Sequence, residues 1–289
     1  MIDGIKIVFL SLVSFLFFSG CNLIDNEQIN PAFLVIDEVN LETSPSQGAP
    51  THKFTDIWVS VDGFLLGVYE LPARIPIIIE NPTTSIRLIP GIRNNGEFSR
   101  AFSYQLIESI FIEDEINPGQ IIEPDLVFKY LDNAIFDFVE GFEGSNQILT
   151  LDLDDDEESK VTITNECVGS ETQSGLMELT SENPLSVIAT AFSYDGDQNA
   201  GADTYLEMEY KNDVPFIVGL IYQEDGQEIS DPIIALNPSD EWNKIYIDFT
   251  ILLARPSIDN YRVFFTADLD QLNTQSGSVY FDNLKLVHL

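Results

Sequence analysis

Short β-type segments separated by turn residues recur along almost the whole chain, and this pattern constrains the fold more than any other feature. One hairpin shows it clearly: residues 57–61 lead into Asp62-Gly63, a dipeptide typical of two-residue hairpin turns, and residues 64–69 follow. Long helices are excluded from the runs that come next, because prolines interrupt them at Pro72, Pro76, Pro82 and Pro90. The sequence therefore predicts an all-β protein.

The segments divide into two groups, which predicts two β-sandwich domains. The first domain is expected at residues 32–131, with strands at 33–41, 57–61, 64–69, 77–79, 85–89, 100–115 and 121–130. The second is expected at residues 132–289, with nine segments at 147–153, 160–164, 176–179, 186–192, 204–210, 216–222, 244–250, 261–267 and 278–287. Nine short strands with polar turns are typical of a two-sheet jelly roll, in which residues 251–255 could add one helical turn.

The charge of the chain restricts its partners. Its 289 residues include 48 acidic and 13 basic side chains, which gives a formal net charge of −35, and the acidic residues are spread through the sequence. Nucleic acid is excluded as a partner, because its phosphates require a basic surface. The same charge disfavours adhesion to anionic surfaces and favours bound divalent cations.

The N-terminus has the features of an export signal. Lys6 precedes an apolar run at residues 7–18, which is shorter than the ~20 apolar residues that span a bilayer. The following Phe18-Ser19-Gly20-Cys21 resembles the lipobox of bacterial lipoproteins, although Phe18 replaces the usual Leu. The resemblance implies a signal peptide at residues 1–20, lipidation of Cys21, and a membrane anchor in the bacterial envelope. The alternative is an ordinary cleaved signal with an incidental cysteine.

The anchor would place the protein in the outer membrane, facing either the periplasm or the cell exterior. Residues 21–31 are polar and are expected to form a flexible tether between the membrane and the fold. If Cys21 carries lipid, Cys167 has no partner for a disulfide. We expect Cys167 to be a buried strand residue, because no sequence context links it to either histidine of the chain as a catalytic thiol would require.

Two resemblances concern the folded domains. The Val61-Asp62-Gly63 turn, the Leu-Gly-Val-Tyr-Glu-Leu-Pro segment after it and a later Arg-Leu-Ile-Pro-Gly strand are similar to PEGA-like and carboxypeptidase-regulatory-like β-sandwiches, which usually act as spacers. This likeness covers residues 56–92. In the second domain, residues 142–144, 205–210, 242–248 and 279–286 resemble carbohydrate-binding-module jelly rolls of galactose-binding-like type.

The jelly-roll resemblance implies a structural calcium ion that joins the first strand of the domain to the last. Glu143 and Asp282 occupy the matching positions, and carboxylate oxygens suit Ca²⁺. Alternatively, Glu143 is a turn residue and Asp282 a carboxylate hydrogen-bonded to backbone. Two other acidic stretches, residues 152–158 and 195–203, are interpreted as a solvated loop and a turn.

The resemblance also implies glycan binding, which requires aromatic rings that stack on sugar faces beside polar groups. The candidates are Tyr210, Tyr222 and Trp242, with Tyr194 and Tyr246 as further possibilities, and the alternative is that these rings belong to the core. Catalytic motifs for nucleophilic, metal-dependent or phosphate chemistry are absent from the sequence, so we predict that the protein is not an enzyme.

Two functional hypotheses remain from the sequence. In the first, the second domain of an anchored, non-catalytic protein binds glycan. In the second, a structural or assembly lipoprotein contacts partner envelope proteins and has no small ligand. An exposed strip of aromatic side chains would distinguish them.

Overall fold

The structure of the chain is a computed structural model that describes residues 30–81, 83–154, 160–169, 171–196, 201–224, 226–270, 272 and 274–289. The expected signal peptide, Cys21 and residues 22–29 of the tether lie outside these ranges, as do residues 155–158 and 197–200 of the two acidic stretches. In the described part of the chain, no helix has the length and apolar character needed to cross a membrane.

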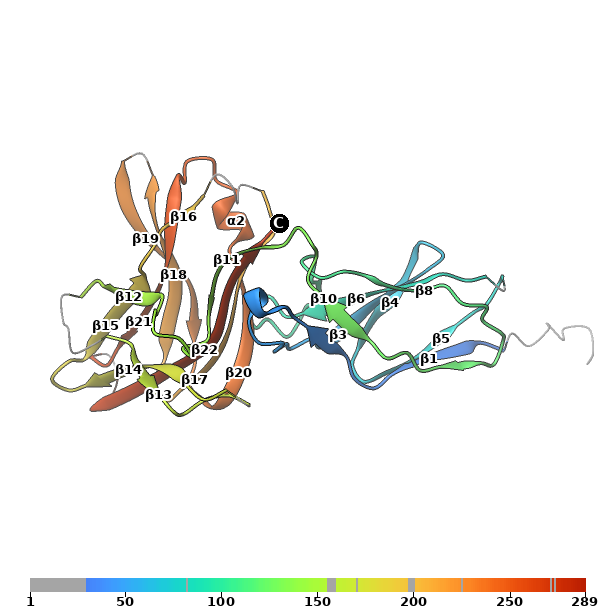
Figure 1. Ribbon diagram of the computed structural model, residues 1–289, viewed down its shortest axis with the longest axis horizontal. Coiled ribbons are helices and arrows are strands. Elements are labelled where there is room, and N and C mark those ends of the chain that lie inside the picture. The colour runs from blue at the N-terminus through green and yellow to red at the C-terminus, as the bar shows by residue number, and fades with distance from the viewer. Residues whose placement is uncertain are drawn as a thin grey trace, which may run out of the picture.

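The predicted all-β architecture of two sandwiches is confirmed (Figure 1). The N-terminal strands are β1 (Ala32–Ile36), β2 (Asn40–Glu42), β3 (Asp56–Val61), β4 (Phe64–Glu70), β5 (Ala73–Ile77), β6 (Ile86–Ile92), β7 (Phe102–Ser103), β8 (Ile110–Ile112), β9 (Ile121–Ile122) and β10 (Val127–Lys129), with a 3-10 turn η1 (Pro45–Gln47). One sheet has the order β5-β1-β9, a second has β4-β3-β6-β7 with β8 on β6, and β10 pairs with β2.

The C-terminal domain is formed by two larger sheets. Its strands are β11 (Ile135–Glu140), β12 (Leu149–Asp152), β13 (Thr162–Thr164), β14 (Ser174–Thr180), β15 (Leu185–Thr190), β16 (Tyr194–Asp195), β17 (Thr204–Asn212), β18 (Phe216–Glu224), β19 (Gln227–Leu236), β20 (Ser239–Asp248), β21 (Asn260–Asp268) and β22 (Ser276–His288). The orders are β13-β14-β22-β17-β20, with β11 on β22, and β12-β15-β21-β18-β19, with β16 on β21. The expected helical turn is α2 (Thr250–Leu253).

Several strand predictions were wrong in detail. Residues 100–115 form two short strands, β7 and β8, because the intervening chain turns to bury Tyr104 and Leu106. The sequence did not predict β19, which contains Pro232. Proline is tolerated at this position for two reasons. β19 is an edge strand, and the pairing of β18 with β19 has a register shift next to Gly219, the residue opposite Pro232. Cys167 is a half-buried loop residue after β13 rather than a buried strand residue.

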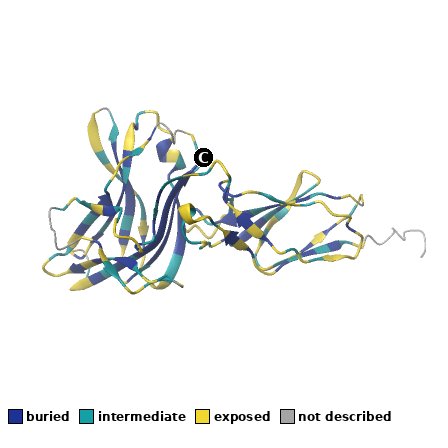
Figure 2. Cartoon of the chain, viewed as in Figure 1, coloured by how far each residue is buried: buried dark blue, intermediate teal, exposed yellow. Residues whose placement is uncertain are grey.

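The N-terminal sandwich packs end-on against one face of the β17, β20 and β22 sheet, with the C-terminus at the junction (Figure 1). Strand alternation creates this second face. Leu206, Met208 and Tyr210 of β17 point into the jelly-roll core, whereas Tyr205 joins the buried cluster of the N-terminal domain. Figure 2 shows the resulting band of buried residues where the domains meet. Both faces of β17 are thus covered by protein.

A buried carboxylate lies at the centre of this interface. Glu207 is fully buried and accepts hydrogen bonds from the hydroxyls of Tyr104 (2.6 Å) and Tyr130 (2.7 Å), both from the N-terminal domain. Lys244 Nζ lies 3.1 Å from its other oxygen. Burial alone would raise the pKa of Glu207, but the charges of Lys244 and Lys285 and the two hydrogen bonds hold that pKa below its usual value. The interface is therefore charged and fixed in geometry.

Candidate functional site

Two of the three predicted aromatic platforms are unsuitable for stacking on a sugar. Tyr210 and Tyr222 are only 6% and 2% exposed, and both rings belong to the jelly-roll core. The ring of Tyr210 packs edge-on against Phe216. The prediction that these two rings form platforms is wrong, because each occupies the same strand face as buried aliphatic residues. Trp242 is half-buried, with its ring 6.3 Å from that of Tyr280, and it stays a prediction.

The other aromatic residues considered from the sequence are also occupied by packing. Tyr246 is buried in the domain interface, where its hydroxyl accepts a hydrogen bond from the Lys53 backbone N–H. Tyr194 is half-buried between Phe138 and Tyr261. Both rings are therefore occupied by contacts with other side chains, and neither offers an open face for stacking on a sugar.

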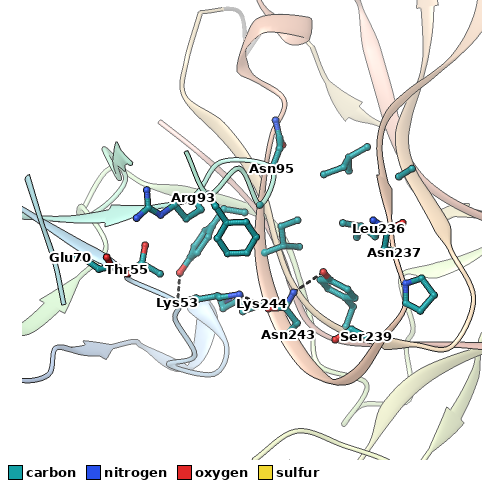
Figure 3. Close-up of a pocket in the computed structure, with 18 residues that line it drawn as sticks. Lys53, Thr55, Glu70, Arg93, Asn95, Leu236, Asn237, Ser239, Asn243 and Lys244 are labelled. Atoms are coloured by element: carbon teal, nitrogen blue, oxygen red, sulfur yellow. Dashed lines mark hydrogen bonds between the residues drawn. The ribbon is translucent and has the colours of Figure 1, made fainter. Parts of the chain in front are cut away.

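A groove lies between the two domains, and we call it the interdomain cleft. It has a volume of about 460 Å³. Its walls come from the segment before β3, from the loop after β6 and from β20 with the turn preceding it (Figure 3). Lining side chains that bear on ligand binding are Lys53, Asn95, Phe98, Asn237, Ser239 and Asn243. Both domains are needed to form the cleft.

The loop after β6 is fastened to the C-terminal domain by a tight turn. Asn95 and Gly96 both have positive φ angles, and the Glu97 N–H donates to the Asn94 carbonyl at 3.0 Å, as in a type I′ turn. The Asn95 N–H donates to the Tyr246 carbonyl at 2.8 Å, and the Asp248 N–H donates to Asn95 Oδ1 at 3.0 Å. The turn therefore covers part of the edge of β20 and fixes the residues that follow it.

Phe98 follows this turn and is 85% exposed although it lines the cleft. Among the described residues that line the cleft, Tyr210 and Tyr246 are buried, so Phe98 is the aromatic ring that a ligand could contact. The sequence analysis missed Phe98 because it searched for aromatics in the second domain. The signal that could have found it is the Asn95-Gly96 dipeptide, which predicts a tight turn and a projecting loop.

The floor of the cleft is polar and internally bonded. Asn243 donates from Nδ2 to the Tyr210 hydroxyl at 2.7 Å and accepts from Lys53 Nζ through Oδ1 (Figure 3). Burial lowers the pKa of Lys53. Arg93, another lining residue, pairs with Asp56 at 3.0 Å. The cleft thus combines one exposed aromatic face with amide and ammonium groups that can bond to hydroxyls.

The two predicted calcium ligands differ in how well they fit a cation. Asp282 is fully buried, and its Oδ2 has no hydrogen-bond partner in the described structure. Burial raises the pKa of Asp282 to about 7. Glu143 is exposed, and three donors from Thr172 and Gln173 occupy its carboxylate, which leaves one free lone pair on Oε2. The geometry therefore favours Asp282 as a ligand more than Glu143.

The two carboxylates nevertheless lie in the same region. Glu143 accepts hydrogen bonds from the N–H groups of Thr172 and Gln173, which precede β14, and β14 pairs with β22 at Gly175 opposite Phe281, the neighbour of Asp282. Asn283, in the left-handed region at φ 49°, forms a bulge in β22 and donates to Glu209 Oε2 at 2.7 Å. Among the described residues, no cluster of three or more acidic, histidine or cysteine side chains could hold a metal ion.

Comparisons with known proteins give likeness of fold only. No protein-family model matches the chain, and no curated protein matches it. Among solved structures, a family 29 carbohydrate-binding module is 12% identical, with 54% of this chain and 89% of that chain covered and a TM-score of 0.35. A variant of a family 29 module complexed with mannohexaose is 11% identical, covering 54% and 92%, with a TM-score of 0.34.

A further similar structure is the enzymatically active domain of tailspike protein 4 from bacteriophage CBA120. It is 12% identical, with a TM-score of 0.37, and the match covers 55% of this chain but only 20% of the tailspike chain. The match thus spans one fifth of that protein.

Proposed function

We propose that this chain is a lipid-anchored, non-catalytic protein of the bacterial cell envelope that binds glycan in the interdomain cleft. The observation that carries the proposal is the 85% exposed ring of Phe98 beside an amide-lined groove. A sugar has an apolar face that an aromatic ring can cover and hydroxyls that need donors and acceptors. The side chains of Asn95, Asn237 and Asn243 offer amides that both donate and accept.

The size and composition of the cleft support binding rather than hydrolysis. Its volume of about 460 Å³ lies within the range of small-ligand sites, about 300–1,000 Å³. Glycoside hydrolysis uses two carboxyl groups that face each other across the sugar. Among the described residues that line the cleft, Glu70 is the single carboxylate. This composition favours a binding site in which the glycan is held and released unchanged.

The site is tested by glycan binding to a soluble form, residues 22–289. A glycan array identifies the ligand, and calorimetry then compares the wild type with Phe98→Ala and Phe192→Ala. Phe192 is a matched control, because it is 69% exposed and does not line the cleft. Truncation of a central aromatic residue is expected to weaken binding about tenfold or more. Phe192→Ala is expected to leave the affinity unchanged.

The possible results distinguish an error in the position of the binding site from an error in the proposed function. Binding that Phe98→Ala does not weaken would move the site elsewhere on the protein. An array without any bound glycan would overturn glycan binding and favour the rival function, a structural or assembly lipoprotein that contacts envelope proteins.

The anchor is supported by the sequence alone, through the apolar run at residues 7–18 and the Phe18-Ser19-Gly20-Cys21 motif. Cys21→Ala is expected to move the protein from the outer-membrane fraction to the soluble fraction of the host. Mass spectrometry of the purified wild type should find acyl chains on Cys21. A Cys21→Ala protein that still fractionates with the membrane would contradict the anchor.

Calcium is proposed as a structural ion at Asp282. A bound cation would give the buried Oδ2 a partner and would favour the ionised carboxylate. A ligand that binds only the folded state raises its stability, by about 2.7 kcal/mol at a hundredfold excess over Kd. Thermal melting in Ca²⁺ should therefore exceed melting in EDTA for the wild type, whereas Asp282→Asn should melt identically in both. Equal melting of the wild type in both would contradict the calcium site.

A further inference from the structure

An apolar surface lies at the end of the N-terminal sandwich that is remote from the jelly roll. We call Pro31, Phe64, Leu65, Leu66 and Ile78 the outer patch. The four large side chains of the patch are all exposed, and Phe64 has 81% of its surface in contact with solvent. Pro31, Leu66 and Ile78 also line a groove of about 340 Å³. Phe64 and Leu65 directly precede Leu66 on β4, so the patch gathers apolar side chains in one region of the domain. Gathered apolar side chains on a folded domain mark contact surfaces.

The arrangement of strands explains why these side chains stay exposed. β4 and β5 are edge strands of two different sheets, and the groove lies between them. A register shift in the β3–β4 hairpin leaves Leu66 without a partner residue on β3. No described strand or loop covers this open side of the sandwich, so the apolar side chains of the hairpin face solvent.

The patch is also the point at which the tether enters the fold. Ala32 pairs with Ile77, and Pro31 forms part of the groove wall. Cys21 precedes Pro31 by ten residues. Ten residues of chain span at most about 35 Å, whatever their conformation. An acylated Cys21 therefore holds the patch within about one domain length of the bilayer at all times.

We propose that the outer patch docks on the lipid surface that holds the anchor. This inference rests on the proposed lipid anchor and goes beyond glycan binding. Large apolar side chains at the lipid–water boundary add to the affinity that an acyl anchor provides. The anchor itself supplies a high local concentration, so a small apolar contact suffices to orient the molecule.

The charges next to the patch specify the kind of lipid surface. Asp62 forms the hairpin tip beside Phe64, and its carboxylate accepts a hydrogen bond from the Ser85 N–H. Thr83 pairs with Glu115, which brings the acidic Glu113-Asp114-Glu115 segment to the same end. Anionic headgroups would be repelled. The docking surface therefore fits a zwitterionic bilayer.

Docking would also set the orientation of the glycan site. The patch lies at one end of the N-terminal sandwich, and the interdomain cleft lies at the other, as Figure 1 shows for the positions of β1 and β5 relative to β20. A molecule that rests on the outer patch holds its cleft and its jelly roll away from the bilayer. The N-terminal domain thus acts as an oriented spacer.

The test places a fluorescent reporter in the patch. The acylated full chain carrying Phe64→Trp is reconstituted in phosphatidylcholine vesicles with and without brominated lipid, and the wild-type emission of Trp58 and Trp242 is subtracted. Phe192→Trp is the matched control, since Phe192 is an exposed phenylalanine of the other domain. We expect blue-shifted and quenched emission from Phe64→Trp and no change from Phe192→Trp. Replacing half of the lipid by phosphatidylglycerol at low salt should reduce the quenching.

A second arm separates failure of the anchor from failure of docking. The soluble form with an N-terminal polyhistidine tag is held on a nickel-chelating lipid in phosphatidylcholine vesicles, which replaces the acyl chains at nearly the same position. Quenching of Phe64→Trp in this arm supports docking even if Cys21 carries no lipid. Unquenched Phe64→Trp in both arms overturns the proposal and assigns the patch to a protein partner. Equal quenching of Phe192→Trp also overturns it, because adhesion would then be nonspecific.

Discussion

The two ends of the N-terminal sandwich differ in a way that inverts the usual distribution of residues. The inner end buries charged and hydroxyl groups, with Glu207 of the jelly roll enclosed by Tyr104 and Tyr130. The outer end exposes large apolar side chains such as Phe64 and Leu66. Polar groups are buried where another domain supplies their partners, and apolar groups are exposed where the described part of the chain does not cover them. The character of the inner end is thus explained by the domain that covers it.

This difference between the two ends predicts that substitutions at the inner end lower the free energy of unfolding more than substitutions at the outer end. Removing the charge of Glu207 leaves the buried Lys244 without its salt-bridge partner and weakens the stabilisation of Lys285, so Glu207→Gln should lower the free energy of unfolding by about 3–5 kcal/mol. Glu42→Gln is the control, because Glu42 pairs with Lys129 at 3.1 Å on the surface, and it should cost less than about 1 kcal/mol. Urea unfolding measures both. Equal losses would mean that the buried charges do not hold the domains together.

A smaller effect isolates the contact between domains. Tyr130→Phe removes one of the two hydroxyls that bond to Glu207 Oε1 and should cost about 1.5–3 kcal/mol, as expected for a hydrogen bond to a charged group. Tyr69→Phe removes the hydroxyl of a half-buried β4 residue and should change stability little. Urea unfolding of both variants provides the measurement. If Tyr130→Phe and Tyr69→Phe lower the free energy of unfolding equally, the hydrogen bond from Tyr130 to Glu207 makes no net contribution to stability.

The pH dependence of stability provides a third comparison. Burial lowers the pKa of Lys285 to about 8, although Glu207 opposes the shift. In the unfolded chain the pKa of lysine is about 10.4, so between these values the unfolded state binds more protons and stability rises with pH. The rise should be at most about 1.4 kcal/mol per pH unit from about pH 8 to about pH 9.5, below the range in which unfolded tyrosines ionise.

Lys285→Met provides the control for this pH profile. Methionine cannot titrate, so the variant should lose the rise and show a flatter profile in urea unfolding. A wild-type stability that falls over the same pH range would contradict the lowered pKa of Lys285.

The sequence predicted the sandwiches but not their mutual arrangement. The alternation of apolar residues predicted strands β17 and β18. The same alternation also argues against Tyr210 and Tyr222 as platforms for a sugar. Tyr210 follows Leu206 and Met208 on one strand face, and Tyr222 follows Leu220, so each ring belongs to the core. The two-residue period of a strand therefore places both tyrosines in the core.

The burial of Glu207 had no such signal. On an isolated sheet, a glutamate that alternates with apolar residues is expected to face solvent. Its burial depends on a separate domain that packs on that face, and the contacting Tyr104 lies more than a hundred positions earlier in the chain. The interdomain cleft depends on the same packing, so it could not be placed from the strand pattern, although the Asn95-Gly96 turn signals the exposed loop that carries Phe98.

The last comparison addresses the outer end, where the smallest change in stability is expected. The double variant Phe64→Ser with Leu66→Ser removes exposed side chains, so its free energy of unfolding should stay within about 0.5 kcal/mol of the wild type. Ile57→Ala, on the adjacent strand β3, removes a fully buried side chain and should cost about 2–5 kcal/mol. Urea unfolding of both variants measures the contrast. A loss above about 1 kcal/mol in the double variant would contradict this expectation. It would mean that the side chains of the outer patch stabilise the folded state through contacts within the protein, because exposed side chains without such contacts contribute little to stability.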